Sequence, residues 1–122
     1  MNQPVTSDHV PYLPIHLQVG TVPPAQVELD LEALVDTGFD GGISLPRDLL
    51  TTPLIPITHH AFKLADATEV MARVYLGHIT IGNLPTVETL VITLGDEVLL
   101  GRRVIDHFRL VFDHGQSITV EL

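Results

Sequence analysis

The chain has 122 residues, of which 45% are hydrophobic and 5% aromatic, so one domain over residues 1–122 with a core of Leu, Val and Ile is expected. It has no cysteine, which excludes disulfides, thiolate catalysis and zinc-finger ligation. Fifteen acidic residues against six basic ones argue against binding to nucleic acid or an anionic membrane, since both need Lys and Arg clusters. The apolar runs fall far short of the roughly 20 residues of a membrane span, so a soluble cytoplasmic protein is expected.

Alternation of apolar and polar residues, rather than helical periodicity, dominates the chain. It predicts eight short strands, which are residues 15–19, 27–33, 43–45, 62–64, 70–81, 87–93, 110–112 and 118–122. The first two strands, joined through Gly20 and Pro23-Pro24, are expected to form a hairpin, as are the fourth and fifth, joined at residues 65–68. Gly77 is expected to make a bulge in the fifth strand.

Helical structure is expected at only two places. Residues 47–50 predict a turn of helix, and residues 102–107 predict one short helix with Val104 and Ile105 facing inward. The proline-containing stretch 51–58 predicts a loop. The fold class expected from these elements is therefore mainly all-β: a closed barrel of short strands with one short C-terminal helix.

Asp36-Thr37-Gly38 is the main candidate for a functional site. The carboxylate follows Leu34 and Val35 directly, and burial of an ionised Asp is unfavourable unless hydrogen bonds or a proton compensate. Taken alone, the triplet is more typical of a turn after a strand. It occurs once, so chemistry that needs two such carboxylates needs two chains. Two loops that meet across a two-fold axis would let the carboxylates share one proton, one acting as base and the other as acid.

Two motifs in order resemble those of retropepsin-like (clan AA) aspartic proteases of the compact bacterial single-domain type. In residues 33–46 an apolar strand leads into Asp36-Thr37-Gly38, and an apolar segment follows, as in the active-site loop of that family. Leu99-Leu100-Gly101-Arg102 resembles the second signature at the start of the late helix, and the intervening hairpin resembles the flap. The resemblance covers about residues 15–122. It implies a retropepsin-like closed barrel and a homodimeric aspartic endopeptidase that needs neither cofactor nor metal.

The resemblance also implies roles for individual residues. Asp36 is the catalytic carboxylate, completed by a second Asp36 in the homodimer, and a water activated between the two hydrolyses the peptide bond. Thr37 braces the two loops at the dimer axis, and Gly38 hydrogen-bonds the substrate backbone. Asp40 contacts the substrate main chain and forms an ion pair with Arg102 that supports the active-site loop from behind.

The predicted flap hairpin supplies further substrate contacts and also an alternative function. Leu64 and Val70, near its tip, are expected to contact a peptide or protein substrate, and residues nearer its base are expected to be core. Phe39 stands where retroviral members carry a small residue, and the turn at residues 65–68 lacks their glycines. These two departures leave open a non-catalytic dimeric peptide-binding or scaffold module that keeps the same fold.

The chain ends are expected to form the rest of the dimer interface. Residues 1–10 and Ile118–Leu122 are the candidates, and Thr119–Leu122 is apolar enough to join a sheet shared by the two subunits.

Other polar clusters are interpreted as structural. His59-His60 predicts a solvated loop pair rather than a metal site, since metal sites need several convergent ligands. Asp113-His114-Gly115 predicts a hairpin turn, and Asp96-Glu97 predicts a solvated acidic turn. No metal site is expected.

Overall fold

The structure is a computed structural model that describes residues 3–20, 26–51 and 53–122. The eight predicted strands are all present, two of them (43–45 and 87–93) with the predicted ends and six with shifted ends, and two short strands are added. The elements in chain order are β1 (Val5–Ser7), β2 (Tyr12–Val19), β3 (Val27–Val35), β4 (Ile43–Leu45), the single-turn helix η1 (Arg47–Leu49), β5 (Thr58–Lys63), β6 (Glu69–Thr80), β7 (Val87–Thr93), β8 (Leu99–Leu100), α1 (Arg102–Ile105), β9 (Arg109–Asp113) and β10 (Ser117–Glu121).

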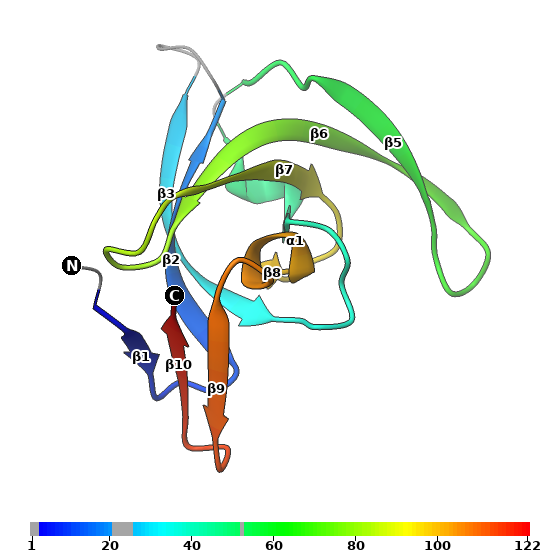
Figure 1. Ribbon diagram of the computed structural model, residues 1–122. Helices are drawn as coiled ribbons and strands as arrows, with labels where there is room; N and C mark the ends of the chain where they lie inside the picture. The colour runs from blue at the N-terminus through cyan, green and yellow to red at the C-terminus, as the bar shows by residue number, and fades with distance from the viewer. Residues whose placement is uncertain (1–2, 21–25, 52) are drawn as a thin grey trace.

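Six strands close into a barrel in the order β2-β3-β8-β4-β7-β6, because β6 returns to pair with β2 (Figure 1). Its interior holds the inward-facing Leu, Val and Ile side chains, among them the fully buried Leu13, Ile43, Val91 and Leu100. The predicted fold class, a mainly-β closed barrel with one short helix late in the chain, is confirmed.

The late helix is shorter than predicted. α1 ends at Ile105, and the amides of His107 and Phe108 donate to the carbonyls of Val104 and Ile105 at 3.1 and 3.0 Å. These bonds span three residues rather than four, so the chain tightens before β9 begins. The tighter turn packs Phe108 against the barrel core, as the apolar pattern requires.

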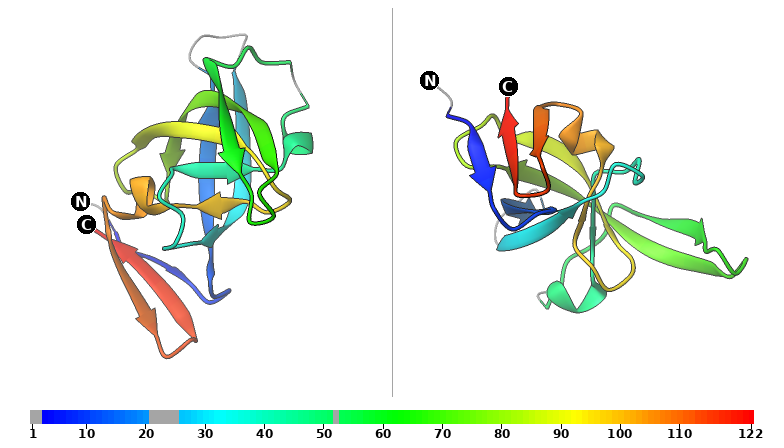
Figure 2. Two further views of the ribbon diagram at one scale, coloured as in Figure 1. Left: turned by 90° about the vertical axis from the view of Figure 1, so that its right-hand side faces the viewer. Right: turned by 90° about the horizontal axis from the view of Figure 1, so that it is seen from below.

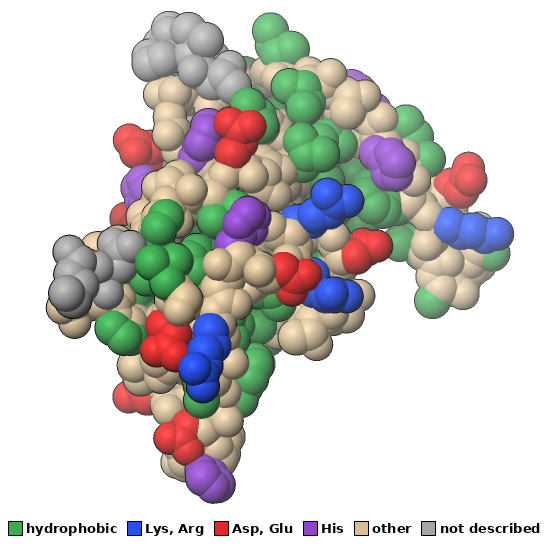
Figure 3. Space-filling view, viewed as in Figure 1, with side chains coloured by type: hydrophobic (Ala, Val, Ile, Leu, Met, Phe, Trp, Pro, Cys, Tyr) green, Lys and Arg blue, Asp and Glu red, His purple; other side chains and the backbone are tan. Residues whose placement is uncertain are grey.

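Two antiparallel hairpins dominate the large sheet, as predicted. β2 and β3 pair from Tyr12 opposite Leu34 to Val19 opposite Val27, and the turn predicted at Pro23-Pro24 lies outside the described residues. Among the described strands β5 pairs only with β6, so the β5–β6 hairpin, called the flap below, extends beyond the closed barrel (Figures 1 and 2). Ile55 and Ile57 just before the flap and Leu64 and Met71 on it are exposed. Figure 3 shows hydrophobic side chains on this side of the molecule.

The expectation of a bulge at Gly77 is wrong. β6 and β7 pair without interruption from Val74 opposite Ile92 to Ile79 opposite Val87. A Cβ at Gly77 would lie 2.5 Å from Val91 Cγ2 and 3.2 Å from the carbonyl oxygen of Gln18. The glycine is therefore needed because β2 and β7 approach β6 closely from both sides, and it leaves the strand regular.

A second sheet of three strands, β1-β10-β9, covers one end of the barrel. Ile118 and Val120 of β10 are fully buried against the core, while Thr119 on the opposite face bonds Thr6 of β1 at 3.1 Å between the two hydroxyl oxygens. Since β10 pairs with β1 on one side and with β9 on the other, both its edges are occupied within the chain. β10 therefore leaves no free strand edge for a partner, and the role of residues 1–10 and Ile118–Leu122 in a dimer interface stays a prediction.

No helix of the described chain combines the length and the hydropathy needed to cross a bilayer.

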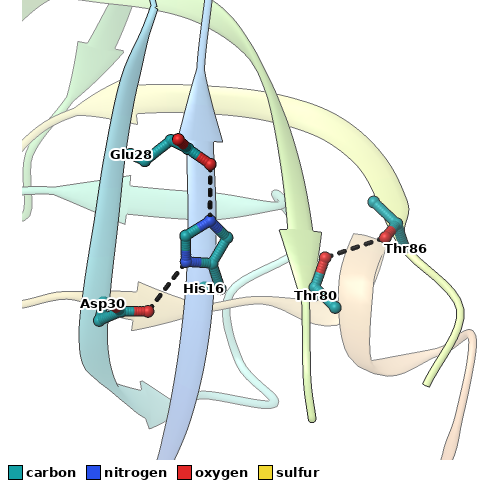
Figure 4. A network of polar contacts seen from close by, with 5 residues as sticks. All are labelled: His16, Glu28, Asp30, Thr80 and Thr86. Carbon is teal, nitrogen blue, oxygen red and sulfur yellow. Dashed lines mark hydrogen bonds and ion pairs between the residues drawn. The ribbon is translucent and has the colours of Figure 1, made fainter. Parts of the chain in front are cut away.

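A histidine on the outer barrel face lies between two carboxylates (Figure 4). His16 Nδ1 is 2.8 Å from Asp30 Oδ1, and its Nε2 is 3.1 Å from Glu28 Oε1. The hydrogen bond to Asp30, and to a smaller extent the one to Glu28, raises the pKa of His16 above its ordinary value of 6.5.

The Thr80 and Thr86 hydroxyl oxygens nearby are 2.9 Å apart and join the end of β6 to the start of β7.

His16 is expected to make stability depend on pH. Because its pKa is raised in the folded state, the stabilisation is complete below the ordinary pKa and is lost as pH rises through the folded pKa. When pH is raised from about 6 to about 8, the unfolding free energy of wild-type protein should fall by more than that of His16→Gln. The difference between the two losses should be less than about 1 kcal/mol, because the His16–Glu28 pair is exposed. Urea unfolding at both pH values measures this, and equal losses in the two proteins would contradict it.

Candidate active site

Asp36 follows β3 at a point where three strands meet. The short strand β8 runs parallel to β3, with Val35 opposite Leu100, and antiparallel to β4, with Ile43 opposite Leu100. The strand before the Asp36 loop and the strand after it are thus joined through β8. The Asp36 amide continues this pattern and donates to the Leu100 carbonyl at 3.0 Å, which fixes the start of the loop.

The triplet forms a tight turn that orients the Asp36 carboxylate. The Gly38 amide donates to Asp36 Oδ1 at 2.9 Å, and the Phe39 amide donates to the Asp36 carbonyl at 3.2 Å. A Cβ at position 38 would lie 3.3 Å from the same Oδ1, so glycine lets the amide approach. Asp36 is partly buried, while Thr37 and Gly38 are exposed. The three predicted catalytic residues therefore lie together at the protein surface.

The start of α1 braces the loop from behind through the backbone. The amides of Arg102 and Arg103 donate to the carbonyls of Phe39 and Gly41 at 2.8 and 3.0 Å. The first amides of a helix have no partner within the helix, so the loop carbonyls satisfy groups that would otherwise lack a bond. β4 begins two residues after Gly41, so the loop is held at both of its ends.

The predicted ion pair between Asp40 and Arg102 is not formed. In the described chain Arg102 pairs instead with Asp106 one helical turn later, Nη2 to Oδ2 at 3.3 Å. Asp40 is exposed, and it lines a cavity of about 410 Å³ together with Arg102, Arg103 and Asp106. Residues four apart on a helix face are already close, so Arg102 pairs with the nearby Asp106. Surface ion pairs of this kind contribute less than about 1 kcal/mol. Support of the loop comes from the backbone bonds above.

Phe39 is accommodated by two glycines. A Cβ at Gly41 would lie 2.6 Å from Phe39 Cζ, and a Cβ at Gly101 would lie 2.6 Å from Phe39 Cδ2. The ring therefore occupies space that side chains at either position would fill. In the sequence Phe39 was only a departure from a known pattern. The structure shows that it belongs to the packing of the loop against the Gly101 motif.

A cavity of about 610 Å³ lies beside the loop, between the flap strands, β7 and α1. Its apolar lining consists of Phe39, Phe62, Val74, Leu76, Leu90 and Ile92, and polar side chains of β5 and β7, namely Thr58, His60, Glu88 and Thr89, also line it. Asp40, Arg103 and His107 line its polar end. The residues that β7 contributes to this cavity were not predicted from the sequence. Successive side chains of a strand point to opposite faces, so Leu90 is 50% exposed while its neighbour Val91 is fully buried.

Leu64 and Val70 lie on the flap, as predicted, but within one chain the flap tip stands apart from the Asp36 loop (Figure 1). Leu64 is 40% exposed, and Val70 is partly buried opposite Phe62. The turn forms without glycine because Ala67 adopts a φ of 72°. Hydrogen bonds from Thr68 to the Asp66 carboxylate order the turn and lower the pKa of Asp66.

The other polar clusters singled out in the sequence lie in a strand, a hairpin turn and a bend. His59 and His60 lie in β5 rather than in the predicted loop, and both are exposed. Within the described ranges no three His, Asp or Glu side chains group in a way that could hold a metal ion. Asp113-His114-Gly115 is a hairpin turn, as predicted, since the Gln116 amide donates to the Asp113 carbonyl at 2.8 Å. Asp96 and Glu97 are exposed in a bend, also as predicted.

A closed six-stranded barrel, a β3 strand that ends at a carboxylate beside β8, and a hairpin outside the barrel together define a retropepsin-like fold. The crystal structure of a retropepsin-like aspartic protease from Rickettsia conorii is similar to this chain, with a TM-score of 0.58 and 18% sequence identity over 97% of this chain and 90% of that one. No protein-family model and no curated protein matches the sequence. The retropepsin-like fold predicted from the sequence is confirmed.

Proposed function

We propose that the protein is a homodimeric aspartic endopeptidase. The observation that carries the proposal is the position of Asp36. It follows β3 directly, and the Gly38 amide orients its carboxylate on a loop held by β8 and α1. The chain contains one Asp-Thr-Gly triplet, so the second carboxylate is the Asp36 of the partner subunit. A fold similar to that of an aspartic protease supports the same chemistry.

The mechanism follows from two carboxylates that share one proton. Like charges at short distance cannot both be ionised, so one Asp36 is a base and the other an acid. The base takes a proton from a water held between them, and the water oxygen attacks the peptide carbonyl carbon. The acid protonates the carbonyl oxygen. When the tetrahedral intermediate collapses, the C–N bond breaks and the amine leaves with a proton returned by a carboxyl group.

The surrounding residues have roles consistent with their positions. Thr37 and Gly38 are exposed beside Asp36, where Thr37 can brace the partner's loop and the Gly38 carbonyl can accept a bond from the substrate backbone. Asp40 belongs to this loop and lines the polar end of the large cavity, where it contacts the substrate main chain. Leu64 and Val70 on the flap contact a substrate that lies extended across the two loops and pairs like an added strand.

A non-catalytic dimeric peptide-binding module is the second candidate. The flap turn favours it, because the hydrogen bonds from Thr68 and the φ of Ala67 fix a tip that glycines would leave mobile. The Asp36 carboxylate argues against it, since a pure binder has no use for a second carboxylate brought beside the first.

A diverse peptide library separates the two functions. Wild-type protein is expected to cleave library peptides at acidic pH, and the rate should fall as pH rises enough to remove the shared proton. Cleavage products identified by mass spectrometry measure this. Asp96→Asn, which changes an exposed carboxylate in a bend, is the matched control and should keep full activity. Wild-type protein that binds peptides and cleaves none from acid to neutral pH would establish the binding module instead.

A further inference from the structure

The polar end of the large cavity beside the Asp36 loop holds two basic side chains without an acidic partner. Arg103 lies in α1 and His107 lies four residues further on, and both line the cavity. Neither forms an ion pair within the described residues, whereas Arg102 on the same helix pairs with Asp106 at 3.3 Å. The chain has fifteen acidic residues and only six Lys and Arg. An arginine that none of those carboxylates occupies is available to a ligand.

The backbone fixes Arg103 and His107 in place and leaves their side chains free. The Arg103 amide donates to the Gly41 carbonyl at 3.0 Å, and the His107 amide donates to the Val104 carbonyl at 3.1 Å. Both side chains are exposed. The planar guanidinium can therefore meet a carboxylate with two parallel N–H donors, and no bond that holds the loop is lost.

The carboxylates near this end of the cavity leave the two basic side chains a net excess. Asp106 is occupied by Arg102, and Glu88 of β7 is occupied by His78, with 3.2 Å between Oε2 and Nε2. Asp40 lines the same end of the cavity, and its proposed role is contact with the substrate main chain. A ligand that reaches this end therefore meets more positive than negative charge once the Asp40 contact is made.

The apolar walls of the cavity add a second requirement. Phe39, Phe62, Leu76 and Leu90 are among the residues that form these walls, and basic side chains lie beside hydrophobic ones between α1 and the flap (Figures 1 and 3). The volume of about 610 Å³ is within the range of about 300–1,000 Å³ that is usual for ligand sites. Alternate side chains of an extended peptide point to the same side. One segment can therefore place a large apolar side chain against the walls and a carboxylate at the basic end, two residues away.

We propose that this cavity selects peptides that carry an acidic residue, Asp or Glu, two positions from a large apolar residue, and that Arg103 binds the carboxylate with His107 beside it. The acidic residue lies away from the bond that is cleaved, because Asp40 lines the cavity and Asp36 and Thr37 do not. That the selected peptide is a substrate rests on the proposed function, whereas its binding rests on the cavity.

Two peptide pools test the selection at about pH 5.5, where Glu side chains are ionised. Both pools lack Asp, Lys and Arg and are otherwise random, but one contains Glu without Gln and the other Gln without Glu. Wild-type protein is expected to cleave the Glu pool at least about fivefold faster, because a charge-assisted bond replaces a neutral one. The net charge of -9 repels acidic peptides over long range, so this preference can come only from local contacts. Equal rates, or faster cleavage of the Gln pool, would overturn the proposal.

Arg103→Gln tests whether the preference comes from this side chain. The variant keeps the backbone bond to Gly41, and its side chain is exposed, so the fold should be retained, as circular dichroism would verify. Its rates on the two pools should agree to within about twofold, since the charged donor is gone. The matched control is Arg47→Gln, which removes an exposed arginine of η1 outside this cavity and should keep the full preference. A folded Arg103→Gln protein with the wild-type preference would overturn the role of Arg103.

Binding of the same pools to immobilised Asp36→Asn protein separates failure of the selection from failure of the proposed function. Mass spectrometry of the retained peptides should show enrichment of the Glu pool, and the double variant Asp36→Asn/Arg103→Gln should lose it. Wild-type protein that cleaves neither pool, with enrichment that depends on Arg103, would reject the endopeptidase and support the acid-selecting cavity. Cleavage of both pools at equal rates would reject the selection and leave the endopeptidase in place. Neither cleavage nor enrichment that depends on Arg103 would overturn both.

Discussion

Asp36→Asn is expected to lower kcat/KM for peptide hydrolysis by at least about 10³-fold, since general acid–base catalysis contributes 10²- to 10⁴-fold and the substitution removes both carboxylates of a dimer. An Asn side chain cannot take a proton from water. Its Oδ1 still accepts the hydrogen bond that the Gly38 amide donates at 2.9 Å, so the turn and the fold should be kept. The measurement uses the library peptide cleaved fastest, with sedimentation as the check that the dimer remains.

Mixed dimers show whether the site is shared between subunits. Wild-type subunits are mixed with a ninefold excess of Asp36→Asn subunits and allowed to exchange. Only about a tenth of the wild-type subunits then have wild-type partners, so activity per wild-type subunit should fall roughly tenfold. The same excess of Asp96→Asn subunits is the control and should cause no loss, because that carboxylate lies in an exposed bend. Activity that stays constant per wild-type subunit would mean that each chain carries a complete site.

Residue patterns along the chain were sufficient for the long strands and insufficient for the short ones. β2 and β3 alternate over eight and nine residues, so one buried face specifies both strands. β8 has only two residues, and no alternation can identify it. Its extended conformation comes from β3 and β4, which pair with it on either side. The same holds for β1, whose three residues are strand because β10 pairs with them.

The backbone position of the candidate site could be predicted from the sequence, whereas the partners of its side chains were not correctly predicted. The position of Asp36 after a buried strand follows from the sequence around the triplet. The partner of Arg102 was predicted wrongly, because the resemblance pointed to Asp40. The helix predicted over residues 102–107 already places Asp106 one turn after Arg102, and this local partner is the one that the structure shows. The central position of β10 in the small sheet becomes visible only once its partners β1 and β9 are known.

Gly101→Ala is expected to destabilise the protein by about 3 kcal/mol and to abolish most of its activity. Gly101 has a φ of -100° and a ψ of -178°, which any residue adopts, so the effect comes from crowding alone. The added Cβ would meet the Gly41 carbonyl oxygen, and it would lie 2.8 Å from the Phe39 carbonyl oxygen and 2.6 Å from the Phe39 ring. Two of these three atoms are backbone, so a rotamer change cannot relieve the contact. The loop that carries Asp36 would have to move away from α1.

Gly95→Ala is the matched comparison for this substitution. A Cβ at Gly95 meets nothing within 4 Å, but its φ of 77° is strained for alanine, so a loss of about 1–2 kcal/mol without loss of activity is expected. Urea unfolding and peptide hydrolysis are measured on both variants. If Gly101→Ala unfolds at the wild-type urea concentration and keeps its activity, the loop is not held against the start of α1, and the bonds from Arg102 and Arg103 do not position the site. If stability falls and activity survives in the folded fraction, the packing is structural only.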